Sequence, residues 1–496
     1  MKLKKIASIL YLAFLAIILA PNGSVRAEIV RLTLLQLNDI YEITPVSGGK
    51  EGGLARVATI EKELRTENPK TYTIVAGDLL SPSALGTARV DGQPLAGRQM
   101  VAVLNVMGLD YATFGNHEFD LKEEQLRQRL GESRFKWLSS NVSDASERAF
   151  PGVLPEEIVT VMGDGGTPVR VGIIGLTIDS NLAGYVRYRD PIEVAKERVE
   201  RLRGRADIIV AVTHLSIDED RRLAKEVPGI DIILGGHEHE NVQEWRGSDF
   251  TPIFKADANA RTVYIHRLSY DTDKKQLEID SQLERITDKI PEDAETARAV
   301  AEWVQRGYSA FRESGFDPGA IVATTTIPLD GLESSVRNGS TNLSELIAEA
   351  MLESVPSAEI SIYNSGSIRI DDVLPPGNIT QYDIIRILPF GGDTVSVEMK
   401  GRLLELVLER GRANRGTGGY LQTEGVRLDE KSGTWAIGGR ALEKERWYRV
   451  AINSFLLTGK ERGLDFLTSD NTQLKVIEKK GDVRFAVIRQ LQRSSK

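Results

Sequence analysis

Short apolar runs alternate with amphipathic stretches from residue 29 to about residue 290. The apolar runs predict buried strands over residues 29–37, 72–75, 171–176, 208–212 and 232–234. Helical spacing of apolar positions predicts helices over residues 54–65, 99–107 and 192–203. This alternation predicts a layered α/β domain over residues 28–290, in which functional residues are expected at the carboxyl ends of the strands.

The pattern changes after residue 290. Residues 291–312 predict one long helix, with Pro291 near its start and Gly315 beyond its end, and we interpret 291–319 as a connector. Residues 320–496 then predict a second α/β domain. It has expected strands at 321–325, 360–363 and 448–452, an expected helix at 343–353, and many glycine and proline turns.

The first 27 residues have the pattern of a secretory leader. Lys2, Lys4 and Lys5 precede an apolar run over residues 6–20, and a small residue, Ala27, ends the stretch. The alternative is an uncleaved anchor, but the run is shorter than the ~20 apolar residues that span a bilayer. We therefore expect cleavage after Ala27, a periplasmic or secreted protein, and no stable membrane anchor.

Composition narrows the possible ligands and partners. The formal net charge is −8, and removal of the basic leader makes the remainder more acidic. Such a surface does not favour nucleic-acid polymers or anionic membranes, whereas a small anionic substrate can still bind at a local cation. The chain has no cysteine, which excludes disulfides and thiolate ligands and leaves His, Asp, Asn and hydroxyl groups.

Polar clusters follow several apolar runs, and they contain four of the five histidines. The clusters are the stretch from Asn38 to Tyr41, Gly77-Asp78, the stretch from Gly115 to Asp120, Thr213-His214 and the stretch from Gly235 to His239. Any one of them alone is better explained as a turn or a structural histidine. The fifth histidine, His266, lies in a strand-like stretch without an acidic neighbour and receives no role.

Together, the clusters can supply ligands for two adjacent cations. Histidine nitrogen and carboxylate oxygen suit zinc, manganese, iron or magnesium. Two metals ~3.5–4 Å apart share a bridging ligand, which a carboxylate provides. The glycines before Asp78, Asn116 and His237 are expected to let the backbone turn so that the side chains converge.

These clusters resemble the motifs of the calcineurin-like metallophosphoesterases, in the branch of the 5′-nucleotidases and UDP-sugar hydrolases. The match from Gly115 to Asp120, Gly-Asn-His-Glu-Phe-Asp, is complete. The resemblance implies a four-layer α/β/β/α domain and two divalent cations (Zn, Mn, Mg, Fe or Co). It also implies that Asp39 and His239 hold one metal, that Asn116, His214 and His237 hold the other, and that Asp78 bridges them. His117, paired with Asp120, is implied to be catalytic rather than a ligand.

One position departs from the family pattern. Where the family has a histidine two residues after the first aspartate, this chain has Tyr41. A phenol has an ordinary pKa of about 10, so it binds a metal well only when the metal deprotonates it. Two interpretations of Tyr41 stay open at this point: a phenolate ligand of the first metal, and a packed aromatic residue at the rim of the pocket.

The C-terminal half offers a candidate nucleotide pocket. Arg369 follows a compact turn that begins at Asn364, Phe390 precedes two glycines, and Phe455 follows the expected strand 448–452. Arginine can hold a phosphate with two hydrogen bonds, and two aromatic faces can sandwich a base for ~1–3 kcal/mol per stacked base.

These stretches are similar to the nucleotide-binding C-terminal domain of the same family. The resemblance implies that Arg337 and Arg369 are phosphate-side cations, that Asn364 touches the base, and that Phe390 and Phe455 are the stacking pair. Two acidic residues, Glu461 and Asp465, are alternatives for holding the ribose.

The implied activity is metal-dependent release of phosphate from nucleoside 5′-monophosphates, with hinge motion around residues 291–320 bringing the substrate to the metals. Alternatives of the same class are a 2′,3′-cyclic-nucleotide phosphodiesterase, a UDP-sugar pyrophosphatase and a thiosulfate-ester hydrolase. An alternative of another class is a non-catalytic nucleotide-binding protein whose first metal site is impaired at Tyr41. The oligomeric state is not predicted.

Overall fold

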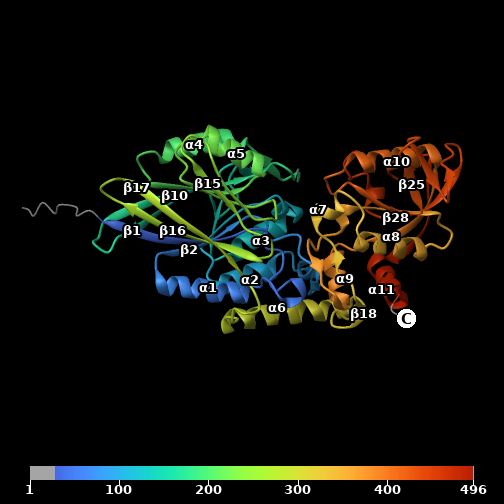
Figure 1. The fold of residues 1–496 in the computed structure, drawn as a ribbon, viewed down its shortest axis with the longest axis horizontal. Coiled ribbons are helices and arrows are strands. Elements are labelled where there is room, and N and C mark those ends of the chain that lie inside the picture. Colours follow the sequence, from blue (N-terminus) through green and yellow to red (C-terminus); the bar gives the residue numbers. More distant parts are fainter. Residues whose placement is uncertain (1–27, 182, 495–496) are drawn as a thin grey trace, which may run out of the picture.

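The chain forms two α/β halves joined by a long helix (Figure 1). The computed structural model describes residues 28–181 and 183–494, so the expected leader over residues 1–27 lies outside the described residues. Within the described ranges, no helix is both long enough and apolar enough to cross a membrane.

Two sheets pack face to face in the N-terminal half. The first has the order β17-β16-β1-β2-β5-β6-β8 and the second the order β14-β15-β13-β12-β10-β9. The strands of the first sheet are β1 (Ile29–Leu37), β2 (Thr71–Ala76), β5 (Tyr111–Thr113), β6 (Lys136–Leu138), β8 (Val153–Leu154), β16 (Thr262–Asp271) and β17 (Gln276–Arg285). Those of the second are β9 (Glu157–Met162), β10 (Pro168–Thr177), β12 (Ile208–His214), β13 (Ile232–Gly235), β14 (Val242–Arg246) and β15 (Thr251–Lys255).

Alternation along the strands creates the layers. In β1, Val30, Leu32 and Leu34 lie in the core between the two sheets, whereas Leu35 and Leu37 lie in the core on the helix side. The helices on that side are α1 (Leu54–Glu67) and α2 (Arg98–Met107), and α4 (Pro191–Leu202) and α5 (Ile217–Glu226) cover the second sheet (Figure 1). The expected four-layer α/β/β/α architecture is therefore confirmed.

Parallel pairing gathers the polar clusters at one edge. Strands β1, β2 and β5 run parallel to one another, as do β10, β12 and β13. Parallel neighbours end at the same side of a sheet, so the segments after β1, β2 and β5 meet those after β12 and β13.

The joining helix is α6 (Ala294–Glu313), close to the expected 291–312. Asp293 caps its N-terminus, because the Asp293 carboxylate accepts a hydrogen bond from the backbone N–H of Thr296. The helix packs against α1 and α2, and its buried Trp303 and Phe311 belong to a core that continues into the C-terminal half. The connector is thus a packed element; the boundaries at residues 290 and 319 stay predictions.

The C-terminal half is built on a sheet of order β24-β20-β28-β23-β29. Helix α8 (Asn342–Ser354) covers one face, where the Tyr363 hydroxyl donates to the Ser344 carbonyl, and α10 (Gly401–Ala413) packs on the other. The strands are β20 (Ile360–Asn364), β23 (Asp393–Lys400), β24 (Leu421–Glu424), β28 (Trp447–Asn453) and β29 (Leu474–Asp482). The helices α7 (Glu333–Val336), α9 (Gln381–Ile387) and α11 (Val483–Ser494) and the small sheets β18-β22, β19-β21 and β25-β26-β27 also belong to this half. The strands of these small sheets are β18 (Ile321–Thr325), β19 (Leu329–Asp330), β21 (Val373–Leu374), β22 (Gly377–Thr380), β25 (Val426–Asp429), β26 (Thr434–Ile437) and β27 (Arg440–Ala441).

Candidate active site

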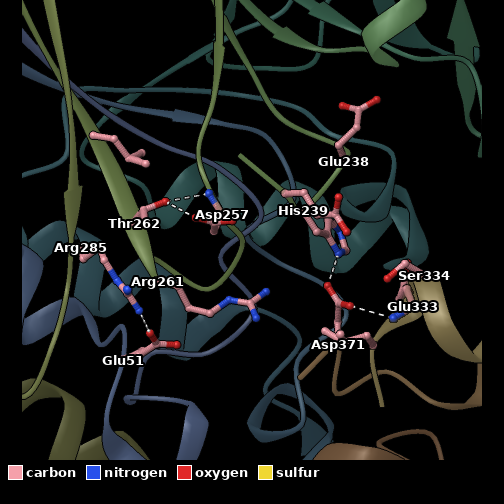
Figure 2. A pocket seen from close by; sticks show the side chains of 13 residues that line it. Glu51, Glu238, His239, Asp257, Arg261, Thr262, Arg285, Glu333, Ser334 and Asp371 are labelled. Atoms are coloured by element: carbon pink, nitrogen blue, oxygen red, sulfur yellow. Dashed lines mark hydrogen bonds and ion pairs between the residues drawn. The ribbon is translucent and has the colours of Figure 1, made fainter. Parts of the chain in front are cut away.

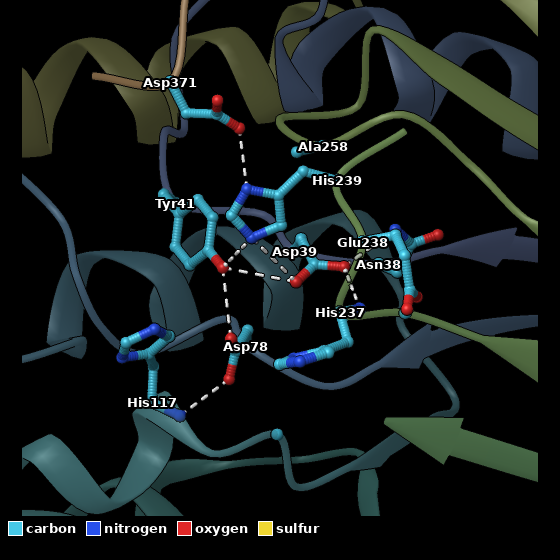
Figure 3. A network of polar contacts seen from close by, with 12 residues as sticks. Asn38, Asp39, Tyr41, Asp78, His117, His237, Glu238, His239, Ala258 and Asp371 are labelled. Carbon is cyan, nitrogen blue, oxygen red and sulfur yellow. Dashed lines mark hydrogen bonds and ion pairs between the residues drawn. The ribbon is translucent and has the colours of Figure 1, made fainter. Parts of the chain in front are cut away.

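Acidic and imidazole groups converge at the shared edge of the two N-terminal sheets (Figure 3). Ligand atoms of Asp39, Asp78 and His214 lie within 4.8 Å of one another, and all three residues are buried. Asp39 follows β1, Asp78 follows β2, and His214 is the last residue of β12. The strand-end clusters therefore meet as expected.

The backbone at this edge is held in unusual conformations. The φ angles of Asp39, Asp78, His237 and His239 are 51°, 55°, 89° and 61°, all in the left-handed region. Each such non-glycine residue costs on the order of 1 kcal/mol or more, which the surrounding fold must offset. The strain thus falls on candidate ligands themselves.

The expected role of the preceding glycines needs a correction. Only Gly77, with φ of 80°, uses the conformational freedom of glycine. At Gly115 and Gly236 the reason is space: an added Cβ would lie 2.0 Å from Asp78 Oδ1 and 2.4 Å from the Ala76 carbonyl oxygen, respectively. These two glycines let neighbouring loops approach closely.

Hydrogen bonds hold the two carboxylates in place. Asp39 Oδ2 accepts from the Asn38 side chain at 2.8 Å and from His237 N at 2.9 Å, and Asp78 Oδ1 accepts from His117 N at 2.8 Å. Burial favours the protonated acid at Asp78, but His214 and His117 outweigh this and lower its pKa to about 2. Asp39 likewise has a pKa well below its ordinary range, because His214 and His239 outweigh burial. Both carboxylates are therefore anionic at neutral pH.

The surroundings of His214 show whether a cation fits at this site. Its Nδ1–H donates to the Ala76 carbonyl at 2.8 Å, so Nε2 is the nitrogen that a metal would take. Burial opposes the charge of this ring, but Asp78 and Asp39 raise the pKa of His214 to about 9, so a metal would take the place of a proton at Nε2. That Nε2 is buried, has no hydrogen-bond partner among the described residues, and lies 3.2 Å from Asp78 Oδ2. An unpaired buried nitrogen beside two carboxylates suits a divalent cation. The residues present fit a metal.

The remaining expected ligands surround this group. Asn116 Oδ1 is also buried without a hydrogen-bond partner in the described part of the chain, as suits a metal-ligand oxygen. The His237 ring lies 5.3 Å from the His214 ring, and His239 Nε2 lies 3.4 Å from Asp39 Oδ1. Burial, followed by the charge of His214, lowers the pKa of His237 to about 3, so this ring is neutral and able to bind a cation.

Tyr41 lies inside this group rather than at its rim. Its hydroxyl is 2.8 Å from His239 Nε2, 3.1 Å from Asp78 Oδ2 and 3.2 Å from Asp39 Oδ1 (Figure 3). Burial and the two carboxylates raise its pKa well above the ordinary value. Tyr41 is therefore a buried residue beside the candidate ligands, and its ligation of a metal stays a prediction.

The expected catalytic pair lies beside the carboxylates. His117 Nδ1 and Asp120 Oδ2 are 2.8 Å apart, and the Asn181 side chain donates to the other oxygen of Asp120 at 2.9 Å. Asp120 therefore has a fixed orientation and in turn holds the His117 ring. By contrast, His266 lies between Gln36 and Ser281 in the core, in keeping with its lack of an assigned role.

A cavity of about 780 Å³ occupies the C-terminal half, and most of the expected substrate residues line it. Phe390 and Phe455 are 55% and 43% exposed, unusually open for phenylalanine, and both face this cavity. Asn364 lines it too, with its side chain held by Ser367, Asn453 and Glu461.

The two expected arginines share one carboxylate. Glu333 Oε1 lies 2.5 Å from Arg337 Nη2 and 3.6 Å from Arg369 Nη1. Arg369 also lines the large cavity, where its guanidinium lies over the Phe390 ring at 5.8 Å. Its Nε is buried and has no hydrogen-bond partner among the residues described, so a donor remains for an anion.

Comparison with known proteins identifies both halves. Residues 32–241 match the family model of the calcineurin-like phosphoesterases, and residues 321–468 match that of the 5′-nucleotidase C-terminal domain. The chain belongs to the 5′-nucleotidase family. Members of this family are metal-dependent hydrolases, and the calcineurin-like domain implies divalent metal ions.

Relatives match along most of this 5′-nucleotidase family chain. It is 28% identical to a snake venom 5′-nucleotidase of Gloydius brevicauda, covering 90% of this chain and 84% of that protein. It is 26% identical to a 5′-nucleotidase of Vibrio cholerae, over 86% and 85% of the two chains. The crystal structure of a 5′-nucleotidase precursor from Thermus thermophilus matches with a TM-score of 0.76 and 25% sequence identity. The match covers 94% of this chain and 97% of that chain.

Sequence reasoning missed several residues that support the site of this 5′-nucleotidase family member. Glu118, within the matched motif, is fully buried and accepts from the backbone N–H groups of Asp78, Leu79, Leu80 and Gly115. Burial and the charge of Asp78 raise its pKa to about 7. An acidic residue between His117 and Phe119 of the motif was the available signal. Glu118 fastens the loop after β2 to the loop after β5.

Lys255 serves a similar purpose for the second sheet and was also missed. It is fully buried, donates to the carbonyls of Leu215 and Gly236, and pairs with Asp220 at 2.8 Å and with Glu238. It thereby joins the loop after His214 to the loop that carries His237 and His239. A lysine at the end of a buried strand gave no signal that separates it from an ordinary surface lysine.

Proposed function

We propose that this chain is an exported phosphohydrolase with two metal ions that releases phosphate from nucleoside 5′-monophosphates. The observation that carries the proposal is the position of Arg369. It lines the cavity between Phe390 and Phe455, and it also lines a small pocket that contains Tyr41. One candidate phosphate-binding side chain thus lines both the base cavity and the small pocket beside Tyr41, which supports a nucleotide whose phosphate faces the metal ligands.

Seven side chains of the N-terminal half would hold the metals. Asp39 and His239 would hold one ion, with Tyr41 as a further oxygen ligand; Asn116, His214 and His237 would hold the other, and Asp78 would bridge. The unpaired atoms of His214 and Asn116 support this assignment. Divalent cations bound there supply charge that polarises a phosphoryl oxygen and lowers the pKa of a water molecule.

The C-terminal half would orient the substrate. Phe390 and Phe455 hold the base, and Arg337 and Arg369 hold the phosphate through charge-assisted hydrogen bonds. Glu461 is our choice for the ribose, because it lines the base cavity and its carboxylate accepts from Asn364 at 3.0 Å. Asp465 is exposed and is not among the residues that line that cavity.

His117 would stabilise the charge that develops on the phosphoryl group. Its Nδ1 is engaged by Asp120, so in the protonated ring Nε2–H is free to donate to a phosphoryl oxygen. Hydrolysis places the water's oxygen on phosphorus, breaks the bond from phosphorus to the ester oxygen, and leaves a proton on the released 5′-hydroxyl. Asp120 keeps the ring in one orientation throughout.

Export is proposed from residues 1–27 alone. The basic residues, the apolar run and Ala27 support a cleaved leader and a periplasmic or secreted location. Mass spectrometry of the protein from the expressing cells would reveal an N-terminus at residue 28. An intact Met1 on cell-associated protein would contradict export.

Phosphate release from AMP, a 2′,3′-cyclic nucleotide and a UDP-sugar tests the substrate. We expect AMP to be hydrolysed with the highest kcat/KM, in a sample that holds two divalent ions per chain by elemental analysis. Preference for either other substrate would move the proposal to a different ester within the same family. No turnover of any substrate, together with tight nucleotide binding, would favour the non-catalytic alternative.

A further inference from the structure

A carboxylate of the C-terminal half contacts a candidate metal ligand of the N-terminal half. Asp371 Oδ2 lies 2.6 Å from His239 Nδ1, and its Oδ1 accepts from the backbone N–H of Glu333 at 2.9 Å (Figures 2 and 3). Asp371 is only 7% exposed, and its φ of 40° places it in the left-handed region. Such strain at a buried polar residue is typical of functional positions.

This contact settles which nitrogen of His239 can bind a metal. A carboxylate at Nδ1 holds a proton on that nitrogen, so Nε2, which lies near Asp39 Oδ1 and the Tyr41 hydroxyl, is the nitrogen that a metal would take in place of a proton. His214 is held in the same way, but its Nδ1 donates to Ala76 of its own domain. Two equivalent ligands are therefore oriented by different halves of the molecule.

Asp371 also connects the metal ligands with the phosphate-side arginines. The Glu333 backbone donates to Asp371, and the Glu333 carboxylate contacts Arg337 and Arg369. Next along the chain, Asp372 accepts from Ser47 N at 2.9 Å and from the Ser47 hydroxyl at 3.2 Å, which is a second contact between the two halves. The two adjacent aspartates thus cross the same interface, but only one of them touches a candidate ligand.

We propose that Asp371 is a positioning residue for the first metal site, so that metal binding there and docking of the C-terminal half strengthen each other. This rests on the proposed two-metal function. Because coupling between two binding events is reciprocal, a bound metal holds the halves together as much as docking orients His239. The halves of this protein are then docked more tightly when the first metal is present.

The adjacent aspartate supplies a matched control. If the pair formed by His239 and Asp371 only held the interface together, replacing Asp371 or Asp372 would have the same effect on metal binding. Asparagine at position 371 can still accept from Nδ1–H but lacks the charge, whereas alanine cannot accept at all. We therefore expect metal binding to weaken in Asp371→Asn and to weaken further in Asp371→Ala, with no such loss in variants of Asp372.

The first measurement is metal affinity of the full chain, by competition between Mn²⁺ and a chromophoric chelator. We expect Asp371→Ala to weaken one of two sites by ~10–100-fold and Asp371→Asn to weaken it less. The second site in both variants, and both sites in Asp372→Ala, should stay within about twofold of the unaltered chain. Equal losses in the Asp371 and Asp372 variants, or no loss at position 371, would overturn the proposal.

The second measurement is hydrogen exchange at the interface, around residues 47 and 372, with and without Mn²⁺. In the unaltered chain we expect metal to slow exchange there. Asp371→Ala should lose this response, whereas Asp372→Ala should exchange faster throughout but retain it. A metal response that survives in Asp371→Ala would contradict the coupling. Circular dichroism establishes that each variant is folded, and Asp371→Asn replaces the alanine variant if the latter is not.

The outcomes separate this proposal from the proposed function. An unaltered chain that binds Mn²⁺ with Asp371-dependent affinity but hydrolyses no nucleotide would remove the function and keep the positioning role. The opposite outcome is an active enzyme that chelators inhibit, with Asp371 variants that bind Mn²⁺ as well as the unaltered chain does. This outcome would contradict the positioning role alone.

Discussion

The metal pocket and the base pocket differ in how completely the fold prepares them. In the metal pocket the carboxylates of Asp39 and Asp78 are buried, fixed by hydrogen bonds and attached to strained backbone. In the base pocket Phe390 and Phe455 remain about half exposed around an open cavity. In the metal pocket, the fold itself offsets the free-energy cost of burying charged groups. In the base pocket, the aromatic rings gain their contacts only when a ligand enters.

This difference predicts two kinds of mutational effect. Changes in the metal pocket should remove metal and lower kcat, because they act on groups that meet the reacting phosphate. Changes in the base pocket should raise KM and leave the metals in place, because base stacking is the same before and during the reaction. The expected effects below run from the largest to the smallest.

Asp78→Asn should have the largest effect. The amide cannot bridge two cations as a carboxylate does, so we expect loss of metal and a fall in kcat on the order of 10³-fold or more. Elemental analysis and steady-state kinetics on one preparation measure both. Asp231→Asn is the control: this carboxylate of the same domain precedes β13, at the far end of the strand from His237, and accepts from Ile209 N. A metal-depleted Asp231 variant would mean that the loss is not specific to the pocket.

His117→Asn should leave the metals bound and still reduce turnover. The ring is a candidate catalytic group rather than a ligand, so we expect kcat to fall ~10²–10⁴-fold with little change in KM. Asp120→Asn should be milder, and the double variant should be no slower than His117→Asn, because Asp120 acts through the ring. Additive losses in the double variant would show that Asp120 has an independent role.

Much of the metal pocket could be predicted from local sequence, because each candidate ligand lies at or soon after the end of a strand. The expected strand at residues 29–37 coincides with β1, and parallel pairing then brings Asp39 beside Asp78. The four-layer architecture followed from the family resemblance, and the packing of the two sheets and their helices confirms it. The local sequence pattern thus predicts which strands end in polar residues.

The supporting contacts could not be predicted in the same way. Asp371 and His239 are 132 residues apart and belong to different halves, so no periodicity relates them. Glu118 was visible in its motif, but its four backbone partners depend on how two loops approach each other. The choice between Glu461 and Asp465 likewise depended on a turn that directs one carboxylate into the cavity and leaves the other exposed.

Phe390→Ala and Phe455→Ala should each weaken nucleotide binding without disturbing the chemistry. Loss of one stacking face costs ~1–3 kcal/mol, which corresponds to a rise in KM for AMP of roughly 5–150-fold. Ribose 5-phosphate, which has the phosphate ester but no base, is the control substrate and should be hydrolysed as by the unaltered enzyme. If both substrates lose activity equally, the rings support the fold rather than the base.

The smallest effect is expected at the ribose. Glu461→Gln keeps an acceptor but loses its charge, which should cost about 1 kcal/mol of binding free energy. We therefore expect KM for AMP to rise roughly fivefold in Glu461→Gln and to stay unchanged in Asp465→Asn.

Burial raises the pKa of Glu461, and its charged form is the better acceptor. The contact is therefore present above that raised pKa and is lost as the pH falls through it. As the pH falls, KM for AMP should rise more steeply than KM for a dideoxynucleotide, which lacks the ribose hydroxyls. In Glu461→Gln the two KM values should depend on pH in the same way. A difference that persists in Glu461→Gln would assign the ribose to another residue.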